Sequence, residues 1–141
     1  MAKKQSLKQY TMRKLGWTDE EYSRQYDIMR KKVAVFNKAT GSSYSPARVL
    51  SWRGKYNVPS YAEEAITATP LRSGKIANEI ALDYIEYRFA GLIEQASDPR
   101  VMQWVEAARS GKITAAQLRD LLSAYADDLH ERRKNDPTVG S

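Results

Sequence analysis

The sequence predicts an all-α protein, a compact orthogonal array of about six or seven helices in a single domain. Three observations lead to this prediction. The chain has 141 residues, a length that suits one domain. Helix-start signals, in which Ser, Thr or Asp precedes Pro or is followed three residues later by Glu or Gln, recur along it. Sustained alternation of apolar and polar residues and Asn-Gly hairpin turns are absent from it.

Capping residues and glycines set the expected helix boundaries. Capping boxes begin helices at Thr18, Ser60 and Thr114, and a Ser-Pro and an Asp-Pro step begin two more. The third helix is expected to end at Gly54, and Ser73 is expected to cap one long, largely apolar helix. The expected helices cover residues 6–15, 19–40, 46–53, 61–68, 74–96, 99–109 and 115–133.

These helices are expected to form one helical domain over residues 17–133. It follows a basic N-terminal arm or short helix at residues 1–16 and precedes a flexible polar tail at residues 134–141. The chain contains no cysteine, which excludes disulfides, thiol nucleophiles and thiolate metal sites. No apolar run approaches the roughly 20 residues that span a bilayer, so no membrane partner is expected.

The net charge of +6 hides a strong asymmetry along the chain. Residues 1–60 carry 13 Lys and Arg against 4 Asp and Glu, whereas residues 61–141 carry 10 against 13. Aromatic residues are interleaved with the cations of the basic half. Segregated positive charge of this kind indicates a polyanionic partner.

The long helix over residues 19–40 carries the first candidate site. At 100° per residue, Arg24, Lys31 and Lys38 fall in one stripe opposite the apolar aromatic face, and Lys32 flanks this stripe. We interpret the helix as a docking element in which these four cations neutralise phosphates.

A thin apolar seam beside that stripe leaves two interpretations open. In the first, Ile28 and Val35 meet a binding partner. In the second, the preceding helix covers both side chains through Leu7 and Tyr10, and the basic stripe is ordinary solvated surface.

The second candidate site lies in and beside the third helix. Tyr44 and two further aromatic residues there alternate with cations, a composition typical of stacking platforms for single-stranded nucleic acid. A helix-turn-helix over residues 45–68 is disfavoured because its second helix carries no basic residue. The candidate binding residues of this region are Arg48, Trp52, Arg53, Lys55 and Tyr56.

An acidic stripe on the helix over residues 74–96 is the one enzyme-like feature of the sequence. Glu79, Asp83 and Glu86 share a face, but no second acidic motif, histidine or catalytic lysine stands nearby. The preferred interpretation is a solvated or arginine-paired face, so we expect no enzyme, no metal and no cofactor. Arg88 projects into the apolar side of this helix and requires a polar partner or a route to water.

The stretch KKQSLKQYTMRKLGWTDEEYSRQYDIMRKKVAVFNKATG, residues 3–41, resembles the openings of small basic proteins of tailed phages and prophages of Gram-positive bacteria. The resemblance covers under a third of the chain. It implies a virion component, a DNA-handling factor or a host-directed inhibitor, located in the bacterial cytoplasm or in the virion. It implies no catalytic residue.

Together these features predict a nucleic-acid-associated helical protein. We expect it to bind the phosphate backbone through its basic half, with little sequence selectivity and strong sensitivity to salt. The alternative is a virion structural or protein-interaction subunit, which docks on an acidic protein surface or assembles with other copies as a homo-oligomer.

Overall fold

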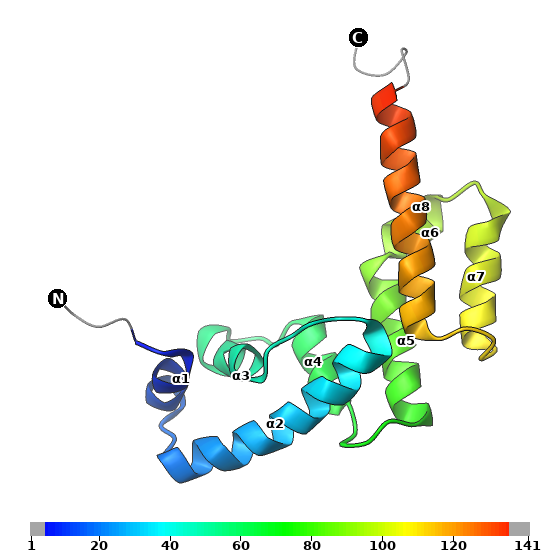
Figure 1. The fold of residues 1–141 in the computed structure, drawn as a ribbon. Helices are drawn as coiled ribbons and strands as arrows, with labels where there is room; N and C mark the ends of the chain where they lie inside the picture. Colours follow the sequence, from blue (N-terminus) through cyan, green and yellow to red (C-terminus); the bar gives the residue numbers. More distant parts are fainter. Residues whose placement is uncertain (1–4, 136–141) are drawn as a thin grey trace.

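The computed structural model describes residues 5–135, which form eight helices and no strand, so the all-α prediction is confirmed. The helices are α1 (Leu7–Leu15), α2 (Asp19–Thr40), α3 (Pro46–Lys55), α4 (Tyr61–Ala68), α5 (Lys75–Arg88), α6 (Ala90–Gln95), α7 (Pro99–Arg109) and α8 (Ala115–Asn135). In Figure 1, α2 crosses the molecule obliquely, with α1, α3 and α4 near it and with α5 and α8 standing at its C-terminal end. The short α6 follows α5, and α7 lies beside α8.

The hydrophobic core lies where α5 meets its neighbours, because α5 packs against α2, α4, α6 and α8. Burying a large apolar side chain stabilises a fold by about 1.5–3 kcal/mol, so this contact region dominates stability. The largest fully buried apolar side chains come from six of the helices and are Met29, Phe36, Val49, Leu50, Ile66, Ile85, Val101, Leu118 and Leu122.

The predicted caps begin and end the helices as expected at most positions. The Thr18 and Ser60 hydroxyls accept backbone N–H groups at the starts of α2 and α4, but the return bonds from the Glu21 and Glu63 side chains that a full capping box requires are not formed in these two helices. Thr114 forms the complete capping box, since its backbone N–H donates to Gln117, whose own N–H donates to the Thr114 hydroxyl. At the other end of α2, Gly41 adopts the left-handed conformation (φ +71°), which a glycine tolerates best.

Three predicted boundaries are wrong. The expected helix over residues 74–96 divides at Phe89, close to Gly91, whose intrinsic helix preference is weak, and this division raises the number of helices to eight. Ser73 does not cap α5, because Gly74 takes the capping position without any side-chain hydrogen bond. The third helix does not end at Gly54 but continues to Lys55.

Contact with α1 explains why a glycine lies inside α3. A Cβ atom at Gly54 would stand only 2.7 Å from the Cβ of Lys14, so the missing side chain lets α1 and α3 approach closely. Residues 7–15 therefore form a helix that packs against α3 rather than a detached arm. Residues 1–4 of the predicted arm and residues 136–141 of the predicted tail lie outside the described residues, and Lys134 still belongs to α8.

We expect the substitution Gly54→Ala to lower the free energy of unfolding by about 1–3 kcal/mol, because the added methyl group overpacks the α1–α3 contact. This sign is opposite to the helix preference, which favours alanine by about 1 kcal/mol. Urea denaturation followed by circular dichroism measures the effect. Gly91→Ala in α6 is the matched control, since its new Cβ meets no atom within 4 Å, and it should be neutral or stabilising. Equal stabilities of the two variants would contradict the prediction.

Candidate functional site

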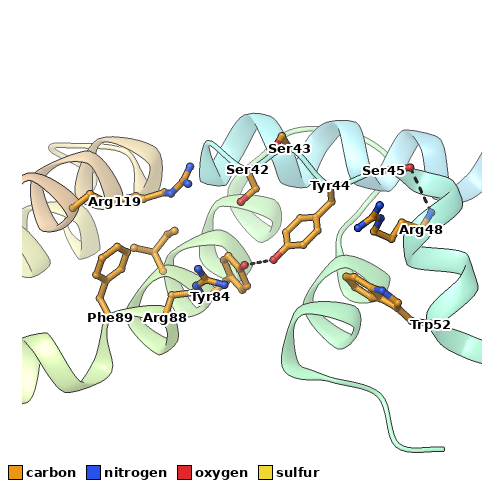
Figure 2. A pocket seen from close by; sticks show the side chains of 12 residues that line it. Ser42, Ser43, Tyr44, Ser45, Arg48, Trp52, Tyr84, Arg88, Phe89 and Arg119 are labelled. Atoms are coloured by element: carbon orange, nitrogen blue, oxygen red, sulfur yellow. Dashed lines mark hydrogen bonds between the residues drawn. The ribbon is translucent and has the colours of Figure 1, made fainter. Parts of the chain in front are cut away.

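A cavity of about 650 Å³ opens between the loop that follows α2, helix α3, helix α5 and helix α8. We call it the arginine pocket, because three arginines from three different helices line it (Figure 2). Its lining contains no carboxylate. The lining residues are Ser42, Ser43, Tyr44, Ser45, Arg48, Trp52, Tyr84, Ile85, Arg88, Phe89, Arg119 and Ser123.

The pocket is built on an aromatic cluster formed by Phe36, Tyr44, Trp52 and Tyr84. The ring centroids of Phe36 and Tyr84 lie 4.9 Å apart in an edge-to-face arrangement, and Tyr44 packs edge-on against Trp52 at 5.9 Å. The hydroxyl groups of Tyr44 and Tyr84 share a hydrogen bond, which Figure 2 shows at the centre of the pocket. This cluster joins α2, α3 and α5, so the pocket wall is part of the folded core.

The three guanidinium groups surround this tyrosine pair. In Figure 2, Arg88 and Arg119 lie on one side of the Tyr44 ring, and Arg48 lies on the other side, near Trp52. Arg119 donates a hydrogen bond to the carbonyl oxygen of Gly41 and so ties α8 to the end of α2. Among residues 5–135, no carboxylate oxygen lies within 4 Å of any of the three guanidinium groups. The pocket therefore carries uncompensated positive charge, an environment that attracts anions.

The tyrosine hydroxyls add neutral hydrogen-bonding groups to this positive environment. Burial raises the pKa of Tyr84 to about 12, and the hydrogen bond with Tyr44 contributes to the rise. The Tyr84 phenol is therefore protonated at neutral pH and adds no negative charge beside Arg88. Hydroxyl groups next to arginine side chains are a common donor set for phosphate oxygens.

A second cavity, of about 660 Å³, lies next to the arginine pocket along α3. It lies between α3 and the start of α1, and Arg48 and Trp52 line both cavities. Lys55 and Tyr56 extend this lining, and the Lys55 ammonium lies 5.5 Å from the centre of the Tyr56 ring. We call these two neighbouring cavities together the α3 groove. The second cavity is lined by Gln5, Ser6, Leu7, Tyr10, Arg48, Ser51, Trp52, Lys55 and Tyr56, again without a carboxylate.

Comparison with known proteins gives no relative for this chain. No protein family model matches it, and searches of curated proteins and of solved structures gave no match. In the described part of the chain, no helix is both long and apolar enough to cross a membrane. Over the same residues, no group of three or more His, Asp or Glu side chains is arranged to hold a metal ion. The interpretation of the groove therefore rests on its own chemistry.

The structure brings together four of the residues that the sequence analysis placed in the second candidate site. Arg48, Trp52 and Lys55 follow the spacing i, i+4 and i+7, so α3 presents them on one face, and Tyr56 follows directly. Their position beside α1 was not expected. Arg53 lies on another face of α3 and lines a different cavity together with Glu63.

The first candidate site on α2 is separate from the α3 groove. Arg24, Lys31 and Lys38 are exposed but line neither cavity of the groove, and the Lys32 ammonium donates to the carbonyl oxygen of Thr67. The four cations thus do not act as one set.

Both interpretations of the apolar seam on α2 were partly wrong. Ile28 is exposed, as partner binding requires, but Val35 is buried within the chain itself. The second interpretation fails for Ile28, because this side chain is exposed and not covered by the preceding helix.

Sequence reasoning missed two of the three arginines in the pocket. Arg88 and Arg119 come from α5 and α8, which lie in the acid-rich half of the chain. Arg88 had one usable signal, its position on the apolar side of a core helix, where a cation requires a route to water. The pocket provides that route. Arg119 has no comparable local signal, because only the fold brings it to the end of α2.

The Glu63 carboxyl group near Arg53 is buried, and its Oε1 atom has no hydrogen-bond partner. Burial raises the pKa of Glu63 above its ordinary value, and the opposing effect of Arg53 does not cancel the rise. The folded chain therefore binds this proton more tightly than the unfolded chain does. The resulting stability is present below the ordinary carboxyl pKa of 4.5 and is lost as the pH rises through the raised value.

We expect Glu63→Gln to raise the melting temperature at neutral pH, because glutamine keeps the shape but carries no charge to bury. The difference from the parent chain should shrink as the pH falls to about 4, where the unfolded Glu63 also becomes protonated. Thermal melts at a series of pH values measure this dependence. A glutamine variant that is less stable than the parent at neutral pH would contradict this prediction. It would show that attraction between Arg53 and a charged Glu63 stabilises the fold.

Proposed function

We propose that this protein binds single-stranded nucleic acid in the α3 groove, with little preference for sequence. In this proposal, backbone phosphates lie against the guanidinium groups of Arg48, Arg88 and Arg119. Bases stack on the aromatic side chains farther along α3, of which Tyr56 is the most exposed.

One observation carries the proposal: two neighbouring cavities that share Arg48 and Trp52 are lined by four cations and by aromatic side chains but by no carboxylate. Positive charge that tracks a backbone, combined with aromatic rings that accept bases, is the combination used by proteins that bind single strands. The arrangement also supports low selectivity, because every base presents a stackable face, whereas base-edge readout requires a donor and acceptor pattern.

A binding role in nucleic-acid handling agrees with one of the three roles that the resemblance of residues 3–41 to phage proteins implies. The proposed site differs from the one expected from that segment, because the groove uses α3, α5 and α8 rather than the cationic stripe of α2. The proposal therefore depends on the groove and not on the resemblance.

The double substitution Arg48→Glu plus Arg88→Glu tests the proposal. Neither side chain forms a hydrogen bond or ion pair with another described residue, so the fold should persist. We expect affinity for a labelled oligodeoxythymidine to fall at least about 10-fold at low salt. The slope of log affinity against log salt should decrease by about 1.4, as expected for two lost phosphate contacts on a single strand. Fluorescence anisotropy at several salt concentrations measures both.

The matched control is Arg72→Glu plus Arg133→Glu, which changes the net charge equally at two exposed positions outside the groove. This variant should bind nearly as tightly as the parent chain. Equal losses of affinity in both double variants would show that binding depends only on net charge and not on the groove. No binding of the parent chain to single-stranded DNA or RNA at micromolar concentration would refute the proposed function.

A further inference from the structure

A second surface, on the helices α4 and α5, has the opposite character to the α3 groove. A shallow groove of about 210 Å³ runs between these helices. Its α4 wall consists of Tyr61, Glu64, Ala65 and Ala68, whose spacing of i, i+3, i+4 and i+7 places them on one helix face. Its α5 wall consists of Ile80 and Asp83.

Exposed apolar side chains surround this α4–α5 groove. Ile76 and Tyr87 continue the face of α5 that carries Ile80 and Asp83, and they are 61% and 58% exposed. The rings of Tyr61 and Tyr87 stack 4.2 Å apart and nearly parallel, so they form a flat platform at one end of the groove. Apolar surface gathered in this way, with a polar rim, is typical of a protein-interaction site.

The rim of the α4–α5 groove is acidic. Burial raises the pKa of Tyr61, and the nearby Asp83, Glu64 and Glu86 carboxylates raise it further, which shows how closely negative charge surrounds the platform. The Arg109 guanidinium forms an ion pair with Glu86 and lies 4.0 Å from the Asp83 carboxylate. Glu64 has no described cation within 4 Å. The groove therefore fits a helix face that combines an apolar side chain with cations.

The same chain carries such a face on α2. Arg24, Ile28 and Lys31 are exposed at the spacing i, i+4 and i+7, so an apolar side chain lies between two cations, of which Lys31 also pairs with Asp27 of the same helix at 3.4 Å. The three residues span about 10 Å along the helix axis, the same length as the α4 wall from Tyr61 to Ala68. Charge and length are complementary, and the α3 groove uses none of these residues.

We propose that the α4–α5 groove of one copy receives the α2 face of a second copy, so that the chains join head to tail. Ile28 enters the groove, and Arg24 and Lys31 meet the carboxylates of its rim. A cation over the stacked tyrosine rings adds a cation–π contact. Because the two faces differ, each copy offers one of each kind, and assembly continues into a ring or an open chain. The inference is independent of the nucleic-acid proposal.

Charge-swap complementation tests this assembly on protein freed of nucleic acid, by sedimentation velocity over a range of concentrations at low salt. The parent chain should assemble as its concentration rises and dissociate as salt is added. The α2 variant, Arg24→Glu plus Lys31→Glu, and the groove variant, Glu64→Lys plus Asp83→Lys, each place like charges opposite each other. Each variant alone should show a dissociation constant raised at least about 100-fold.

An equimolar mixture of the two variants restores opposite charges at every contact, and we expect it to assemble again. Circular dichroism melts confirm that each variant is folded, and Arg72→Glu plus Arg133→Glu should assemble like the parent chain. A parent chain that stays monomeric at every concentration overturns the inference. The inference is also overturned if either variant assembles as well as the parent chain, or if the mixture of folded variants remains monomeric. Oligonucleotide binding by the monomeric variants is measured separately. The result for assembly therefore stays distinct from the test of the α3 groove.

Discussion

The aromatic cluster of Phe36, Tyr44, Trp52 and Tyr84 is the contact on which the rest of the structure depends. It joins the C-terminal part of α2 to α3 and α5, and the shared hydrogen bond of the two tyrosine hydroxyls closes it. Asn37 fixes the loop that delivers Tyr44, because its side chain both donates to and accepts from the Tyr44 backbone at 3.0 Å. The positions of α3 and α5 therefore follow from this cluster, and so do the positions of Arg48 and Arg88 on either side of it.

Charge is distributed over the surface in a way that folding stability alone does not explain. Three arginines collect around one pocket without a described carboxylate partner, although their mutual repulsion opposes folding. Elsewhere in the described chain, arginines do find carboxylates, as Arg109 finds Glu86 and Arg100 finds Asp98. What sets the pocket apart is that three arginines without a described carboxylate partner share one cavity, and in the proposed function a bound anion supplies the negative charge that the cavity lacks. The acidic, apolar α4–α5 groove is a surface of opposite sign, and Arg109 pairs with only part of its acidic rim.

Local signals predicted the secondary structure well, and they failed where distant segments meet. The caps at Thr18 and Ser60 and the left-handed Gly41 act within one helical turn, so the sequence alone reveals them. Gly54 looked like a helix end, because nothing local indicates that α1 packs against it.

The same distinction applies to the candidate site. The sequence predicted Arg48, Trp52, Lys55 and Tyr56 because they are neighbours in one helix and the loop after it. It did not predict that Arg88 and Arg119 join them, since that requires the packing of α5 and α8 around the aromatic cluster. It also grouped Lys32 with the exposed cations of α2, whereas the fold directs this ammonium to a backbone carbonyl of the segment at Thr67.

The chain contains three tryptophans, and only Trp52 lines the α3 groove, so their indole N–H signals offer the most direct test of the central claim. In a two-dimensional nitrogen–proton NMR titration with oligodeoxythymidine, the account predicts a saturable shift of the Trp52 indole signal. The side-chain Nε–H signals of Arg48, Arg88 and Arg119 should move with it, while the indole signals of Trp17 and Trp104 stay in place. Shifts concentrated on Arg24 and the neighbouring amides of α2, with an unmoved Trp52 signal, would contradict the account.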